Sequence, residues 1–188
     1  MWKERRKGLV NKMAKGSKYV VQYRRKRKGK TDYNKRLETL KSGSHRMVIR
    51  PSDKHIIVQI IEYKEAGDIV KASAHSTELK KFGWTFSTSN TPAAYLTGLL
   101  CGFRGCSNGI KDAILDIGLN PSIKGSRLYA ALRGAVDSGF KIPHDASIFP
   151  DEGRIKGEHI ATYRNRKDIP EKFVEVKGKI MEGFKNKK

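Results

Sequence analysis

The densest group of chemically active side chains in the sequence is a basic run at residues 24–30. Six of its seven residues are Lys or Arg, Gly29 is the exception, and Tyr23 and Tyr33 lie close on either side. Lysine and arginine neutralise phosphate groups, and both the guanidinium plane of arginine and a tyrosine ring stack on unpaired bases. These residue types at this density indicate a site for a polyanion.

A second interpretation of the same run is a solvated charged arm with no specific role. No apolar residue occurs between Arg24 and Lys30, so the segment has nothing to bury. We therefore expect it to be extended. It would then belong to a basic arm over residues 1–30 that is disordered until a partner such as RNA orders it.

A helix signal follows the basic run directly. The side-chain oxygen of Thr31 or Asp32 can accept hydrogen bonds from the first-turn amides, and Ser42 with Gly43 provides a stop. Helical spacing brings three apolar side chains to one face and three cations to the opposite face: Tyr33, Leu37 and Leu40, and Lys35, Arg36 and Lys41. We expect the apolar face to lie on the protein core and the cations to point outward.

Charge is unevenly distributed along the chain, which has a formal net charge of +21 and a pI near 10.1. Residues 1–50 contain 18 Lys and Arg against 3 acidic residues, residues 51–163 contain 13 against 12, and residues 164–188 contain 9 against 4. An enzyme for a small acidic molecule would concentrate charge in its cleft, so no small-molecule substrate is expected. Charged ends instead suit a long phosphate backbone or an anionic membrane surface.

The membrane is the weaker of these two partners. No stretch of 18 apolar residues occurs, and the basic arm has no interleaved apolar face.

Cys101 and Cys106 are five residues apart, which suits neither a disulfide within one helix nor the CxxC spacing of a zinc site. We expect both to be small buried residues in a protein of the reducing cytosol. The first residues show no secretory signal, and Met13, followed by Ala14, is a plausible alternative start.

The central part of the sequence predicts an α/β fold, more closely an α+β arrangement with a mixed sheet. Residues 45–50, 55–63 and 68–75 carry strand patterns separated by turn residues, which predicts a three-stranded antiparallel meander. A helix is expected over residues 92–107, and a buried strand over residues 112–117 follows it. Strand, helix and strand in this order predict a β-α-β crossover with a parallel pair of strands.

Two further helix patterns complete the expected organisation. The first spans residues 126–138 and completes a core domain of residues 31–140. Within this domain, the glycines at positions 98 and 102 predict that the helix at 92–107 approaches another element closely. A C-terminal extension, residues 141–188, contains short helices and a last helix over residues 170–184. In that helix four apolar residues recur at helical spacing, Phe173, Val176, Ile180 and Phe184, so we expect it to dock on the core.

The loop at residues 118–127 offers a second possible anion site. It contains two glycines and Ser122, Lys124, Ser126 and Arg127 just before a helix start, which can bind a phosphate. It lacks the Gly-Lys-Ser/Thr order of a Walker loop. A structural loop and a phosphate contact remain equally open.

Little in the sequence indicates catalysis. No HExxH motif occurs, the five histidines are scattered, and no cofactor or metal ligand set is recognisable. Asp112 and Asp116 bracket a predicted strand and can mimic the carboxylate pair of a metal-dependent nuclease. This gives the alternative hypothesis of an RNA-processing or RNA-modifying enzyme with a divalent metal, whereas solvated strand ends give the simpler one. The segregated charge favours a binding protein over an enzyme.

A set of short motifs, in order, carries a family resemblance. The motifs are Lys18-Tyr19, Arg24-Arg25-Lys26-Arg27, Lys30-Thr31-Asp32-Tyr33, Arg36-Leu37, Leu40-Lys41-Ser42-Gly43, Ala72-Ser73-Ala74-His75-Ser76, Ala94-Tyr95-Leu96-Thr97-Gly98, Leu115-Asp116-Ile117-Gly118-Leu119-Asn120 and Ile142-Pro143-His144. Over about residues 15–163 the chain resembles the archaeal branch of the family of universal large-subunit ribosomal protein eighteen, which is related to the eukaryotic ribosomal protein L-five. Residues 1–12 lie outside this pattern.

The resemblance implies a structural protein of the large ribosomal subunit in the cytoplasm that binds 5S rRNA. It also implies contacts with 23S rRNA and neighbouring large-subunit proteins in the central protuberance. The basic arm, the helix start at Thr31 and the exposed face of the three-stranded sheet would meet the RNA, with Thr31 serving either its helix cap or a ribose. The candidate RNA-binding residues are Lys18, Tyr23, Arg24, Arg25, Lys26, Arg27, Lys28, Lys30, Thr31, Tyr33 and Arg36, with Arg46, Arg50, Lys54, Lys124 and Arg127 as second-tier candidates.

Overall fold

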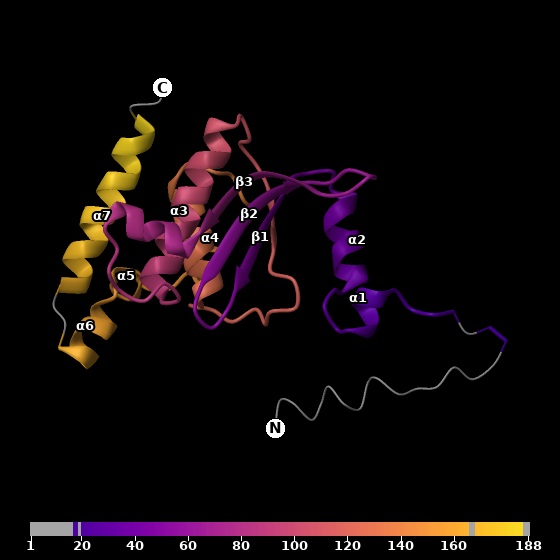
Figure 1. Ribbon diagram of the computed structural model, residues 1–188, viewed down its shortest axis with the longest axis horizontal. Coiled ribbons are helices and arrows are strands. Elements are labelled where there is room, and N and C mark those ends of the chain that lie inside the picture. The colour runs from indigo at the N-terminus through magenta and orange to yellow at the C-terminus, as the bar shows by residue number, and fades with distance from the viewer. Residues whose placement is uncertain (1–16, 19, 166–167, 186–188) are drawn as a thin grey trace.

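The fold is seen in a computed structural model that describes residues 17–18, 20–165 and 168–185 (Figure 1). Met13 and the first part of the predicted basic arm lie outside these residues. The elements in chain order are α1 Arg24–Arg27, α2 Tyr33–Lys41, β1 Arg46–Pro51, β2 Ile56–Glu62, β3 Ile69–His75, the 3-10 helix η1 Ser76–Phe82, α3 Thr91–Ser107, β4 Ile114–Asp116, α4 Arg127–Asp137, the 3-10 helix η2 Ala146–Ile148, α5 Glu152–Lys156, α6 Glu158–Arg164 and α7 Asp168–Lys185.

The four strands form one mixed sheet in the order β3-β2-β1-β4. β2 pairs antiparallel with both β1 and β3, while β4 runs parallel to β1, with Leu115 opposite Met47. The connection from β3 through α3 therefore crosses to the far edge of the sheet. The mixed sheet with its helices confirms the predicted α/β class and shows which strand is the parallel partner of β4.

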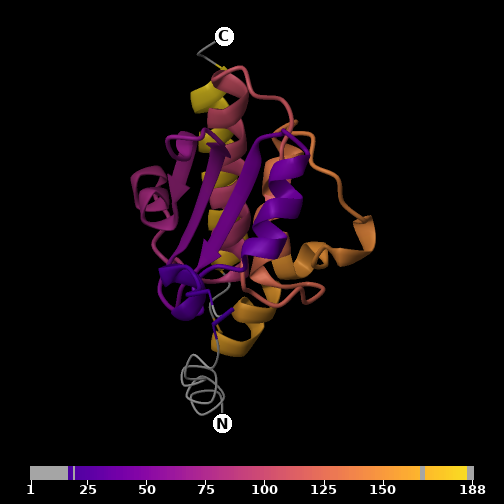
Figure 2. The ribbon, with the colours of Figure 1, turned by 90° about the vertical axis from the view of Figure 1, so that its right-hand side faces the viewer.

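Alternation along the strands divides the sheet into a buried face and an open face. In β2 the side chains of Ile56, Val58 and Ile60 are buried, and those of Ile57 and Ile61 point to the other side. The helices α3 and α4 cover the buried face (Figure 1). Seen from the side of the open face, α2 stands in front of one edge and α1 lies at one end of the strands, and no other helix of the described residues covers that face (Figure 2).

The close approach of α3 and α4 depends on two glycines. A Cβ atom on Gly98 would overlap the carbonyl oxygen of Ala131, and one on Gly134 would overlap that of Tyr95. Only glycine leaves room for the two backbones at these points. The predicted close approach at Gly98 is confirmed, and the partner is α4.

The segment predicted as a buried strand at residues 112–117 is shorter and less buried than expected. Its strand, β4, has three residues, all half-buried, because it lies at the edge of the sheet. Neither Cys101 nor Cys106 forms a disulfide. Cys101 is fully buried, and this burial raises the pKa of its thiol to about 12, which makes it an inert core residue.

The last helix, α7, docks on the far side of α3 as its pattern predicted. Phe173, Val176 and Ile180 are buried, and the ring centroid of Phe173 lies 5.4 Å from that of Tyr95. At the end of the helix, Phe184 stacks on Phe103 with centroids 5.4 Å apart. The molecule is thus layered from α7 through α3 and α4 to the sheet, with α2 outermost on the other side (Figure 1).

Candidate nucleic-acid interface

The basic run forms one short helical turn, so the expectation of an extended segment is wrong here. Arg24–Arg27 make up α1, and the amides of Gly29 and Lys30 donate to the carbonyls of Lys26 and Arg25. Arginine and lysine are good helix formers, and Gly29 at φ +60° accommodates the left-handed conformation that reverses the chain. That the basic arm is disordered without RNA stays a prediction.

The turn presents its cations to solvent together with two aromatic rings. All side chains of residues 24–30 are exposed. Tyr23 is 70% exposed, and its ring centroid lies 5.0 Å from that of Tyr33 in the first turn of α2. Lys35 is exposed in the same turn. We call residues 23–30 with Tyr33 and Lys35 the basic surface.

Two polar residues join this surface to α2. The Asp32 carboxylate caps the helix by accepting from the amides of Asn34 and Lys35 at 3.0 and 3.3 Å. Thr31 has a different role, because its hydroxyl oxygen accepts a hydrogen bond from Arg25 Nε at 2.8 Å. Of the two cap candidates in the sequence, Asp32 is the cap, and Thr31 fixes α1 against the helix start.

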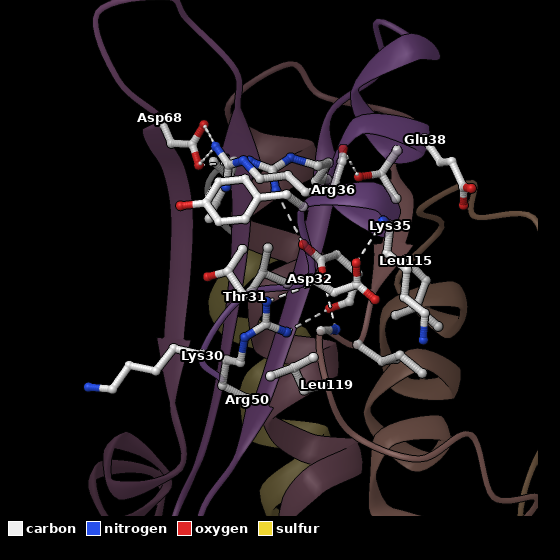
Figure 3. Close-up of a pocket in the computed structure, with 18 of the residues that line it drawn as sticks. Lys30, Thr31, Asp32, Lys35, Arg36, Glu38, Arg50, Asp68, Leu115 and Leu119 are labelled. Atoms are coloured by element: carbon white, nitrogen blue, oxygen red, sulfur yellow. Dashed lines mark hydrogen bonds and ion pairs between the residues drawn. The ribbon is translucent and has the colours of Figure 1, made fainter. Parts of the chain in front are cut away.

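The predicted packing of α2 on its apolar face is wrong. No residue of α2 is buried, and Leu37 is 55% exposed. Arg36, expected to point outward, instead points toward the sheet (Figure 3). An ion pair thus replaces the expected apolar contact between helix and sheet.

The ion pair is the first link of a network of five charged residues. Arg36 donates to both oxygens of Asp68 at 3.0 and 2.9 Å, and Arg46 donates to Asp68 at 2.8 Å and to Asp116 at 3.2 Å. Arg50 completes the network with a contact of 3.2 Å to Asp116. These contacts connect α2, β1, β4 and the β2–β3 turn, as the dashed lines in Figure 3 show.

The network changes the roles expected of three arginines. Arg46 is only 2% exposed and is bonded to two carboxylates, which disfavours the RNA contact predicted for its side chain. Arg36 is likewise occupied by Asp68. Arg50 keeps 43% of its side chain exposed and remains accessible to a phosphate.

The Asp68 carboxylate of the network is held in its charged form. Burial raises the pKa of Asp68, but the hydrogen bonds from Arg36 and Arg46 outweigh it and bring the pKa below its ordinary value. Asp116 is occupied by two arginines and by the amide of Gly118. Sequence reasoning missed Asp68 altogether, because a single aspartate after Gly67 in a turn carries no signal of its partners.

A groove of about 780 Å³ separates α2 from the open face of the sheet. Cations from the basic surface, including Arg25, Lys30 and Lys35, line this groove together with the apolar side chains of Val48 and Leu115. The five-residue network also lines this groove. The groove is therefore adjacent to the basic surface and continuous with the open sheet face.

The remaining candidate residues lie on other elements. Lys18 and Lys54 are exposed before α1 and in the turn after β1, and Lys124 is exposed in the loop before α4. Arg127 donates to the carbonyl of Ser89 at 2.7 Å, which favours the structural interpretation of that loop. None of these four residues lines the groove.

The carboxylate pair of the alternative enzyme hypothesis does not form a metal site. Asp116 is neutralised by Arg46 and Arg50, while Asp112 is exposed and its backbone pairs with Lys141. Within the described ranges, no three side chains of His, Cys, Asp and Glu gather as metal ligands. The same ranges contain no helix of the length and apolarity that crossing a membrane requires.

Known proteins resemble the chain over most of its length. The model of a family described as ribosomal large subunit proteins 60S L5 and 50S L18 matches residues 17–111 and 104–145. A protein of Methanothermobacter thermautotrophicus is 47% identical over 190 residues, covering 90% of this chain and 99% of its own length.

Two other relatives show the same similarity. A protein of Methanococcoides burtonii is 48% identical over 172 residues, covering 92% of this chain and 99% of its own length. A protein of Korarchaeum cryptofilum is 53% identical over 154 residues, covering 82% of this chain and 79% of its own length. All three relatives are named large ribosomal subunit protein uL18.

Proposed function

Because the chain belongs to the family of ribosomal large subunit proteins 60S L5 and 50S L18, we propose that it binds 5S rRNA and helps attach it to 23S rRNA in the central protuberance. It is an archaeal-type protein of the large subunit of the cytoplasmic ribosome and not an enzyme. Ribosomal RNA and ribosomal proteins are therefore its partners. The choice of 5S rRNA and the site for it are the proposal.

The basic surface is the single observation that supports this proposal most. It gathers exposed cations with Tyr23 and Tyr33 next to a groove and an open sheet face, on a body that is almost neutral between residues 51 and 163. Lysine and arginine there neutralise phosphates, and the two rings offer stacking positions for unpaired bases of an RNA loop. No step of bond making or breaking is needed, and the protein acts by holding RNA.

A second group of cations lies on the opposite side of the molecule. Lys80 and Lys81 are exposed in the last turn of η1, and the ammonium groups of Lys172 and Lys179 lie beside Gly83, where η1 ends. Glu175 pairs with both α7 lysines at 2.8 and 2.5 Å, so the four cations of this group outnumber the one carboxylate that pairs with them among the described contacts. Separate cationic sides support a role in joining one RNA to another.

Titration of the purified protein with 5S rRNA, with transfer RNA as competitor, tests the proposal. Engagement of six to ten phosphates predicts that log K falls against log salt with a slope on the order of −4 to −9. We expect 5S rRNA to bind in the presence of excess transfer RNA, with crosslinks in the basic surface. Equal competition by transfer RNA, or crosslinks that avoid residues 23–36, would contradict it.

A further inference from the structure

Asp68 occupies the position where α2 meets the sheet. It immediately precedes β3, and its carboxylate accepts three hydrogen bonds: two from Arg36 of α2 and one from Arg46 of β1, at 2.8 to 3.0 Å. Arginine–carboxylate contacts in which one carboxylate meets several N–H groups are among the stronger and more directional polar contacts in proteins. Three charged groups from separate elements thus meet at one side chain.

The helix α2 has little else to hold it in place. It has nine residues, none of them buried, and a helix of this length is marginal in water by itself. Of the described side-chain hydrogen bonds and ion pairs that leave α2, those of Arg36 with Asp68 are the ones that reach the sheet. The basic surface is attached to this helix through Tyr33, Lys35 and the Asp32 cap.

We propose that Asp68 is a positioning residue for RNA binding, which holds α2 and the basic surface beside the open sheet face through Arg36. The proposal rests on the proposed function and adds to it a residue that does not touch the RNA itself. The groove between α2 and the sheet keeps its shape through this contact, so RNA meets a surface that is already formed and loses less ordering entropy on binding.

The sign of the effect distinguishes positioning from simple electrostatics. A carboxylate beside a site for phosphates repels them, so its neutralisation should by charge alone strengthen RNA binding. If Asp68 holds α2 in place, neutralisation weakens binding instead. Glu38 is the matched control, because it lines the same groove from α2, is exposed and has no ion pair among the described contacts.

The test compares Asp68→Asn with Glu38→Gln in titrations of 5S rRNA against the full chain. We expect Asp68→Asn to lower affinity by about tenfold or more, whereas Glu38→Gln leaves it equal or tighter. Asp68→Glu retains the carboxylate and should recover most of the loss. If Asp68→Asn binds as tightly as Glu38→Gln, the inference is overturned and the proposed function stands. If the unmodified chain shows no preference for 5S rRNA, the proposed function itself fails.

Two further measurements separate positioning from loss of folding and from a direct RNA contact. We expect trypsin to cleave at Lys35, Arg36 and Lys41 faster in Asp68→Asn, while the melting of the α3–α4 core is unchanged. Arg36→Gln combined with Asp68→Asn should cost little more affinity than either change alone, because each change already breaks the contact between α2 and Asp68. Additive losses would assign Arg36 to the RNA and overturn the inference. If Asp68→Asn does not fold, Arg36→Gln carries the same cleavage and affinity test, since Arg46 keeps its pairing to Asp68, and unchanged cleavage would then contradict positioning.

Discussion

The two outermost helices, α2 and α7, are attached to the same body by opposite means. α7 buries Phe173, Val176 and Ile180 against α3, whereas α2 buries no residue and is tied to the sheet by Arg36 and Asp68. Burial of apolar area involves no attraction between charges that salt could screen. The attraction between the two charges of an exposed ion pair is screened by salt. The side of the molecule that we assign to RNA is therefore the one whose attachment responds to charge.

This contrast has a functional meaning for a protein that holds RNA. A large apolar face would hold a basic helix by burial, independently of charge. α2 instead presents Lys35 and Tyr33 from a helix that a polar contact, Arg36 with Asp68, holds against the body. The apolar side, with α7, stabilises the fold, while an ion pair keeps the charged side in position for the RNA.

The largest expected effect is on the apolar side. Phe173→Ala removes a buried ring that packs on Tyr95 and should lower the free energy of unfolding by about 3–5 kcal/mol. Chemical denaturation with a fluorescence readout measures this loss. Val174→Ala, at a neighbouring residue that is 61% exposed, is the control and should change the free energy far less. Equal effects at the two positions would mean that α7 does not depend on burial.

The second effect is confined to the charged side. Replacement of Arg24, Arg25, Lys26 and Arg27 by alanine removes four exposed cations and should flatten the salt dependence of RNA binding by about three units of slope. The melting temperature should hardly change, because these side chains bury nothing. Salt titrations of 5S rRNA binding measure the slope. An unchanged affinity and slope would remove this segment from the interface.

A third prediction concerns pH and the attachment of α2. The hydrogen bonds from Arg36 and Arg46 lower the pKa of Asp68 against the opposing effect of burial. A carboxylate whose pKa is lower in the folded state than in the unfolded state stabilises the fold when the pH is above its ordinary pKa, here 3.8. This contribution is lost as the pH falls through the folded-state pKa.

The measurement is the difference in free energy of unfolding between the native sequence and Asp68→Asn, from pH 6 down to pH 2. Subtraction removes the contribution of the other acidic residues, such as Glu78, whose pKa is also lowered. We expect the difference to be constant above about pH 4 and to shrink toward lower pH. A difference that grows as the pH falls would contradict the direction of the shift.

The smallest effect is expected at Leu37. Leu37→Ala truncates an apolar residue of α2 that is 55% exposed, so it should change the free energy of unfolding by less than about 0.5 kcal/mol. Phe173→Ala and Leu37→Ala both truncate an apolar side chain to alanine, so their comparison tests the contrast between α7 and α2. A loss above about 2 kcal/mol would show that α2 is held by its apolar face after all.

Much of the fold follows from local patterns. The alternation in β2 decides which of its residues are buried, and Asp32 and Asn90 mark helix starts because each side chain caps the first turn. Gly98 indicates a close approach for the same local reason, since its lack of a Cβ is a property of the residue itself. The density of cations near Tyr23 likewise predicts the basic surface, because a run of charges with nothing to bury stays exposed in any fold.

The sequence by itself thus determined the three strands of the meander, the starts of α2 and α3, the amphipathic α7 and the cationic character of the chain around residues 24–30, since each depends on spacing within a few residues. Only the tertiary structure decided that Arg36 and not Leu37 faces the sheet, that β4 joins β1, and that Asp68 and Asp116 bind arginines. The Arg36–Asp68 and Arg46–Asp116 contacts join residues 32 and 70 positions apart. No local period encodes such distant contacts, because their free energy arises only where the folded chain brings the charges together.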